Sequence, residues 1–104
     1  MYAKTNIMQI IVTDKHLEEA IKYSNGPDIA CKCLIAQALT DAGFKYVAVA
    51  SSNIFVSKKS DERATEKATI DGDVDWFINA FDRHAYALIR ERLPFQFNLH
   101  TYPW

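Results

Sequence analysis

Hydrophobic and polar positions follow several spacings along the chain, and each spacing predicts a kind of element. Residues 7–12 form an apolar run rich in β-branched side chains, which predicts a first strand. Thr13 is a residue type that often caps helices, and the apolar positions over 14–24 recur at helical spacing. The sequence Asn-Gly-Pro at 25–27 then ends this first helix.

A second helix is predicted to begin after Asp28 and to run to Ala42, with a continuous apolar stripe. Gly43 lies where a glycine commonly closes a helix. Residues 44–50 and 54–56 are rich in valine and aromatic side chains, which favour strands. The short polar turn between them predicts a hairpin.

The next segment, 58–67, is charged and is either a loop or the extended tip of a hairpin. Residues 68–70 predict a short strand. Asp73 is then the expected cap of a third helix. The helical stripe reaches at least Asp82, and if it continues without a break it reaches Glu91.

Pro94 ends the third helix, and apolar residues alternate with polar ones over 95–99, which predicts a half-buried strand. Residues 100–104 are expected to form a short aromatic tail. The order β-α-α-β-β-(β)-α-β predicts an α+β fold of two layers: a mostly antiparallel sheet of three to five strands with about three helices. Residues 1–104 form one domain in this interpretation.

Composition narrows the classes of function. The 104 residues carry 12 basic and 13 acidic side chains, a formal net charge of −1. That balance argues against strong general binding of nucleic acid, although it leaves room for a local basic patch. The sequence shows neither a signal peptide nor an apolar run long enough to span a membrane, so a cytoplasmic location is expected.

Cys33 is the sharpest candidate for chemistry, because a cysteine near a helix N-terminus can become nucleophilic. His16 is its candidate base, with Asp14 or Asp28 to orient the imidazole. The alternative is structural, with Cys31 in the core and Cys33 on its flank. The two cysteines are two residues apart and would diverge on a helix, so a disulfide between them is not expected.

Metal and cofactor sites are not predicted. Structural zinc sites take four ligands from two close pairs, and the chain offers one pair among these candidates: Cys31, Cys33, His16, His84 and His100. The acidic run 71–75 resembles a calcium loop, but its twelfth position is an aspartate instead of the closing glutamate. The three glycines all lie at expected turns or caps, so there is no phosphate-binding glycine loop.

Three surface segments are candidates for partner binding: the charged segment 58–67, the outer face of 82–92 and the tail 100–104. Tyrosine and tryptophan are common interface anchors, and Arg83, His84, Arg90 and Arg92 could form a basic strip on the outer face of the third helix. The candidate residues are Lys58, Lys59, Arg63, Arg83, Tyr86, Arg90, Tyr102 and Trp104. The alternatives are a solvated helix face and a tryptophan that folds back onto the core.

Four motifs, in order along the chain, carry a resemblance to a known family. They are Ile-Val-Thr-Asp-Lys-His at 11–16, Cys-Leu-Ile-Ala-Gln-Ala-Leu-Thr-Asp-Ala at 33–42, Phe-Ile-Asn-Ala-Phe-Asp at 77–82 and Pro-Phe-Gln-Phe-Asn-Leu at 94–99. Together they resemble a family of small phage and prophage proteins, in which proline stands at the position of Leu34. The resemblance implies a viral or mobile-element origin and brings no catalytic residues with it.

The leading expectation is therefore a phage-encoded protein that binds a host or phage protein, for example an inhibitor of a host defence system of the anti-CRISPR kind. One alternative is a small thiol-dependent enzyme that uses Cys33 and His16. Another is a nucleic-acid-binding accessory protein that uses the face of residues 83–92. A homodimer through a strand edge or the tail is compatible with each of them.

Overall fold

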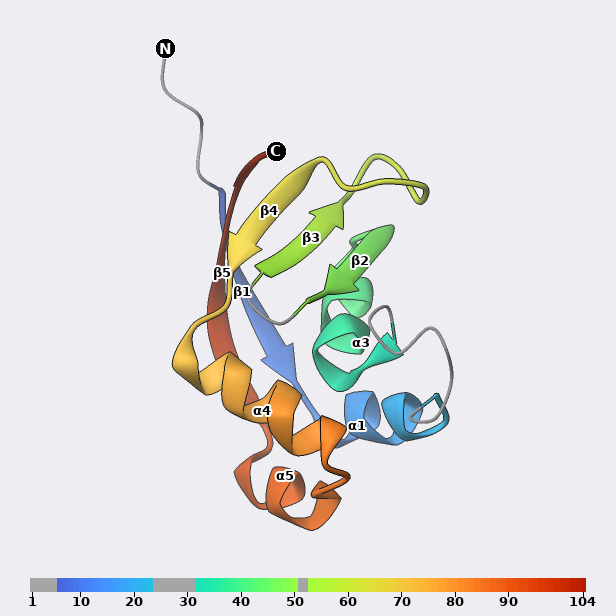
Figure 1. The fold of residues 1–104 in the computed structure, drawn as a ribbon, viewed down its shortest axis with the longest axis vertical. Coiled ribbons are helices and arrows are strands. Elements are labelled where there is room, and N and C mark those ends of the chain that lie inside the picture. Colours follow the sequence, from blue (N-terminus) through green and yellow to red (C-terminus); the bar gives the residue numbers. More distant parts are fainter. Residues whose placement is uncertain (1–5, 24–31, 51–52) are drawn as a thin grey trace.

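Five antiparallel strands form one curled sheet, and helices pack against it (Figure 1). The computed structural model describes residues 6–23, 32–50 and 53–104. Along the sheet the strand order is β1-β5-β4-β3-β2, with every neighbouring pair antiparallel. The expected α+β class is confirmed.

The elements have the following bounds. They are β1 (Asn6–Val12), α1 (Asp14–Ile21), α3 (Leu34–Asp41), β2 (Tyr46–Val49), β3 (Asn53–Ser57), β4 (Glu66–Thr69), α4 (Gly72–Asp82), α5 (Tyr86–Arg92) and β5 (Phe95–Pro103). The described residues thus contain four helices where about three were expected. The expected caps and breaks at 25–28 lie outside the described residues, as does Cys31.

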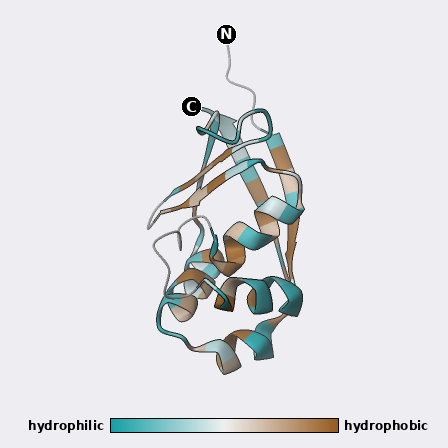
Figure 2. Cartoon of the chain, turned by 90° about the vertical axis from the view of Figure 1, so that its right-hand side faces the viewer, coloured by the Kyte–Doolittle hydropathy of each residue, from teal (hydrophilic) through white to brown (hydrophobic). Residues whose placement is uncertain are grey.

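Side chains alternate between the two faces of the sheet, as the pleat requires. On the inner face Ile10 lies opposite Phe97, and both are buried. On the outer face Ile7 lies opposite His100, and both are exposed. Figure 2 shows this alternation as hydrophobic and hydrophilic bands along the strands. The sheet therefore has one face for the core and one face for water or a partner.

Helix α3 occupies the centre of the core. Leu34, Ile35 and Leu39 are fully buried, although they point in different directions around the helix. Thr40 and Asp41 form its exposed side, and the apolar remainder of the helix needs cover from its neighbours. Here α3 contacts α1, α4 and the two edge strands β1 and β2. It thus fills the space between the two edges of the curled sheet.

Gly43 ends α3 as the sequence predicts. Its φ of +110° suits glycine, which lacks a Cβ. The Gly43 N–H donates to the Thr40 carbonyl at 3.1 Å, and the Phe44 N–H donates to the Leu39 carbonyl at 3.2 Å. This pair of bonds is the Schellman motif, which satisfies carbonyls left over at a helix C-terminus.

His84 ends α4 in the same way, and here the sequence-based expectation was wrong. His84 has a φ of +59°, its N–H donates to the Phe81 carbonyl at 3.0 Å, and the Ala85 N–H donates to the Ala80 carbonyl at 2.9 Å. This second Schellman motif has histidine in the usual place of glycine. The expected continuous helix to Glu91 is therefore two helices, α4 and α5.

Three further boundaries differ from expectation. Strand β5 continues to Pro103, so most of the expected tail 100–104 belongs to the sheet. Strand β4 begins at Glu66, which shortens the charged loop to residues 58–65. The cap of α4 is Asp71, not Asp73, because an Asp71 carboxylate oxygen accepts from the Val74 N–H at 3.0 Å. In the first two cases polar residues at strand ends obscured the alternation.

Candidate functional site

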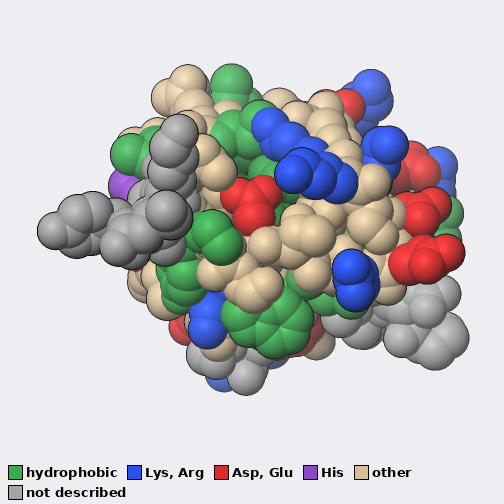
Figure 3. All heavy atoms as spheres, turned by 90° about the horizontal axis from the view of Figure 1, so that it is seen from above, with side chains coloured by type: hydrophobic (Ala, Val, Ile, Leu, Met, Phe, Trp, Pro, Cys, Tyr) green, Lys and Arg blue, Asp and Glu red, His purple; other side chains and the backbone are tan. Residues whose placement is uncertain are grey.

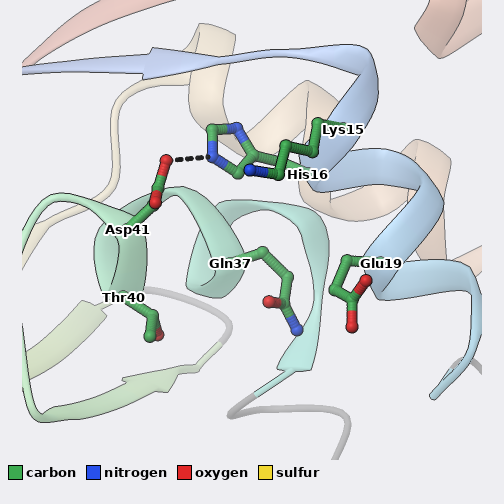
Figure 4. A pocket seen from close by; sticks show the side chains of 6 residues that line it. All are labelled: Lys15, His16, Glu19, Gln37, Thr40 and Asp41. Atoms are coloured by element: carbon green, nitrogen blue, oxygen red, sulfur yellow. Dashed lines mark hydrogen bonds and ion pairs between the residues drawn. The ribbon is translucent and has the colours of Figure 1, made fainter.

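His16 lies between α1 and α3 with both ring nitrogens engaged (Figure 4). Its Nδ1 accepts from the Thr13 backbone N–H at 3.0 Å, and its Nε2 lies 3.1 Å from Asp41 Oδ2. Because Nδ1 accepts, the proton of the neutral ring resides on Nε2 and is donated to Asp41. His16 thereby fills the position that glutamate or glutamine takes in a capping box.

This geometry differs from the proposed thiol site. Among the described residues the carboxylate that contacts His16 is that of Asp41, not the expected Asp14, and Asp28 lies outside the described residues. Cys33 is the N-cap residue of α3 and is 5% exposed. A histidine base would need a ring nitrogen directed at the thiol, and both nitrogens of His16 are already engaged. The structure therefore offers the thiol hypothesis no support.

A hollow of about 280 Å³ lies beside His16. Its lining comes from two helices: Lys15, His16 and Glu19 of α1, and Gln37, Thr40 and Asp41 of α3. Most of its polar groups already have internal partners; Gln37 donates to the Lys32 carbonyl and Thr40 to the Ala36 carbonyl. Among the described residues no group of three or more metal-ligating side chains is close enough to hold a metal ion.

The partner-binding candidates fall at two distant ends of the molecule. The first group lies where the 58–65 loop meets the end of β5, and consists of Lys58, Lys59, Arg63, Tyr102 and Trp104. The second group lies on α4 and α5, and consists of Arg83, Tyr86 and Arg90. Figure 1 shows the β3–β4 loop and the end of β5 at the top, and α5 at the bottom. No single patch contains all eight residues.

Ser57 organises the loop at the first end. Its Oγ accepts from the backbone N–H groups of Lys59 and Ser60, at 3.1 and 3.0 Å, and from the Thr65 hydroxyl at 2.9 Å. Ser57 is fully buried, so these bonds are shielded from water. The loop is thus tied back to β3, and its Lys58 and Arg63 project from a fixed base.

Trp104 is the most exposed large hydrophobic residue described, at 69%. Its ring lies against Phe55 with centroids 5.0 Å apart, and its backbone N–H donates to the Thr65 carbonyl at 3.2 Å. A hollow of about 400 Å³ is bordered by Trp104 together with Arg63, Ala64 and Thr65. Trp104 therefore rests on the outer face of the sheet, not on the core.

This first end carries charges of both signs. Figure 3, a view onto it, shows basic and acidic side chains interspersed with hydrophobic ones. Lys58 lies over the Phe44 ring at 5.3 Å. Within the described chain, no carboxylate comes within ion-pair distance of Lys58, Lys59 or Arg63. Lys58 thus has a ring contact instead of an ion pair, and Lys59 and Arg63 have no ion pair among the described residues.

At the second end, the expected arginine strip is largely committed to internal contacts. Arg90 forms an ion pair with Glu18 of α1, with Nη2 and Oε1 2.8 Å apart. Tyr86 packs against Phe81 and His84, with centroids 5.6 Å apart in each case. Arg83 is exposed at the C-cap of α4. Two of the three predicted residues therefore hold α5 in place.

Sequence reasoning missed Leu88 and Trp76 at this end, whereas Arg92 belongs to the candidate face of residues 83–92. Leu88 is 54% exposed. Arg92 follows it by four residues, and the Arg92 guanidinium lies 3.8 Å from the centre of the Trp76 ring. Leu88 continues the apolar spacing of the third helix, which predicts a buried side chain. The turn at His84 rotates α5, so that Ile89 is buried instead. Only the position of that turn could have revealed the difference.

Comparison of the chain with known protein families, with curated protein sequences and with solved structures finds no match. The resemblance to phage proteins therefore rests on the quoted motifs alone. None of the helices in the described residues has the length and apolar character needed to cross a membrane.

Proposed function

We propose that the chain acts by binding another protein through its helical end, defined here as Trp76, Arg83, Leu88 and Arg92. The observation that supports this most is the exposed leucine beside the stacked arginine. Leu88 and Arg92 are four residues apart on α5 and so share a face. Arg92 covers the Trp76 ring, which is half-buried on α4.

The residue types fit a protein partner. Tryptophan and arginine are enriched among residues that dominate binding energy, and an apolar centre with a polar rim is typical of interfaces. The base under this surface is rigid, since Ile89 is fully buried and Arg90 is tied to Glu18. A rigid surface loses little conformational entropy when it binds.

The test is capture of a specific partner with matched variants. The protein is immobilised and exposed to host lysate, with and without an added defence complex, and bound proteins are identified. Leu88→Asp and Arg92→Ala are expected to lose the partner about tenfold or more, as for an interface anchor. Ile7→Ser is the control, because Ile7 is 65% exposed on β1, away from the helical end.

A partner that is retained equally by all three variants contradicts this assignment of the surface. Circular dichroism and urea unfolding of each variant show whether a loss of binding reflects loss of the fold.

The concrete form of the proposal is a phage-encoded inhibitor of a host defence system. Its support is the resemblance of four sequence motifs to phage and prophage proteins. The check is interference by a purified CRISPR effector complex, measured with and without the protein. Genes for other defence inhibitors beside its own gene would add support, whereas unimpaired interference contradicts this form.

A further inference from the structure

The outer face of the sheet differs in charge from the rest of the molecule. The outward strand positions are Ile7, Gln9 and Ile11 of β1, Tyr46 and Ala48 of β2, Asn53 and Phe55 of β3, Lys67 and Thr69 of β4, and Gln96, Asn98, His100 and Tyr102 of β5. These positions include one lysine, one histidine and several amides, but no aspartate or glutamate. The chain as a whole has 13 acidic residues.

Aromatic rings and a cation meet on neighbouring strands of this face. Phe55 of β3 lies opposite Lys67 of β4, which in turn lies opposite Tyr102 of β5. The Lys67 ammonium lies 5.7 Å from the centre of the Tyr102 ring. The Trp104 ring lies 5.0 Å from the Phe55 ring, centroid to centroid, and Trp104 stays 69% exposed. One lysine and three aromatic residues thus lie on neighbouring positions of this face, with Lys67 in contact with Tyr102.

We propose that this outer face binds single-stranded nucleic acid. Unpaired bases can stack on Phe55, Tyr102 and Trp104, since every base offers a flat π-face. Lys67 and Arg63 are placed to neutralise phosphates beside these rings. Antiparallel sheets with aromatic residues on adjacent strands are a known type of platform for single strands.

Charge complementarity favours this occupant over a protein. A phosphate backbone repeats its negative charge at every nucleotide, so it needs a path without carboxylates. The strand positions of the outer face supply such a path, with Gln96 and Asn98 exposed along β5 to donate to base edges or phosphates. A protein partner has no comparable requirement for the absence of acidic groups.

The small number of cations beside the rings limits the expected affinity for nucleic acid. Lys67 contacts Tyr102 and Arg63 borders the hollow beside Trp104, whereas Asp61 and Glu62 lie exposed in the adjacent loop. A single strand loses affinity with a log–log salt slope of about −0.7 for each neutralised phosphate, so two cations give about −1.4. The overall charge of −1 therefore remains consistent with weak, local binding.

The experiment measures fluorescence anisotropy of labelled (dT)8, (dA)8 and (rU)8 with the intact chain at low and moderate salt. Binding is expected at low salt for the single strands, whereas a duplex of the same length binds less well. Trp104→Ala is expected to weaken binding by about tenfold, as for loss of one stacked base. Lys67→Gln is expected to weaken binding at low salt and to reduce the salt slope by about 0.7, as for loss of one phosphate contact. Trp104 is exposed, so its replacement spares the core.

Leu88→Asp is the matched control, since it changes the helical end and is expected to leave oligonucleotide binding unchanged. If the protein binds the DNA strands but not the RNA strand, or the reverse, the result supports the proposal and shows which kind of nucleic acid is the ligand. Three outcomes overturn it: no anisotropy change at low salt, equal binding by all variants, or a captured protein that requires Trp104 and is not displaced by the oligonucleotides. A negative result for oligonucleotide binding leaves the test of the helical end unaffected, because that test depends on replacements of Leu88 and Arg92.

Discussion

His16 Nε2 lies 3.1 Å from Asp41 Oδ2, and this hydrogen bond joins the first turn of α1 to the last turn of α3. The two ends of the bond differ in their surroundings. The His16 side chain is 10% exposed, whereas that of Asp41 is 67% exposed. The imidazole is therefore part of the packing between helices, and the carboxylate is a solvated partner of it.

Replacement of His16 by alanine is expected to destabilise the fold by about 1–3 kcal/mol, because the Thr13 N–H loses its acceptor and a buried ring is removed. Asp41→Ala is expected to cost less than about 1 kcal/mol, as for an exposed partner in water. Urea unfolding of both variants measures the difference. Equal losses would show that the bond to Asp41, not the bond to Thr13, is what matters.

Ser57→Ala is expected to loosen the 58–65 loop, since the N–H groups of Lys59 and Ser60 lose their acceptor. Unsatisfied buried donors cost about 1–3 kcal/mol in all. Amide hydrogen exchange at Lys59 and Ser60 should become faster. Thr69→Ala is the control, because Thr69 is exposed on β4 and far from the loop contacts. Unchanged exchange would mean that the loop is held by other contacts.

His84 offers a test of the break between α4 and α5. Its left-handed backbone conformation disfavours β-branched side chains, so His84→Val is expected to be about 1–2 kcal/mol less stable than His84→Asn. Both replacements remove the ring contact with Tyr86, which makes them a matched pair. Thermal and urea unfolding measure the difference. If valine is as stable as asparagine, the helix does not turn at this residue.

Cys33 is expected to react slowly with iodoacetamide in the folded protein, because it is 5% exposed. The measurement uses a Cys31→Ser variant, so that one thiol is followed. Unfolding in urea provides the control and should restore the rate of an accessible thiol. Rapid alkylation of the folded protein, at a pH low enough for an ordinary thiol to react slowly, would instead support the hypothesis of a thiol-dependent enzyme.

Apolar periodicity predicted most of the fold because most of the core obeys it. The stripe of α3 and the alternation at Phe97 and Leu99 are buried as expected. The glycine at 43 revealed the end of α3, since few other residues adopt its conformation. His84 has the same role at α4, but a histidine gives no such signal in a sequence.

Polar residues inside the sheet explain the errors at strand ends. Thr101 is buried on the inner face of β5, where its hydroxyl donates to Glu66 Oε1 at 2.9 Å. The same oxygen accepts from Asn6 Nδ2 at 3.0 Å. These side chains form their hydrogen bonds only after three strands have met. In the sequence, a polar residue at an inward position therefore looks like part of a loop and not like part of a strand.

The candidate surfaces were predictable as residue types but not as places. Sequence reasoning selected Trp104 as an aromatic anchor and Arg90 as part of a basic strip. The fold places Trp104 on the outer face of the sheet and ties Arg90 to Glu18. Which aromatic or basic residue stays available depends on contacts between segments far apart in the chain.

The pairing of β1 with β5 also constrains the order of events during synthesis on the ribosome. In the described sheet β1 has β5 as its strand partner, from Asn6 opposite Thr101 to Val12 opposite Phe95. Residues 6–12 must therefore wait, unpaired, until residues 95–103 have emerged. Contacts of such long sequence separation slow folding. Among the described strands, the apolar β1 thus has the longest exposure to mispairing and to chaperones.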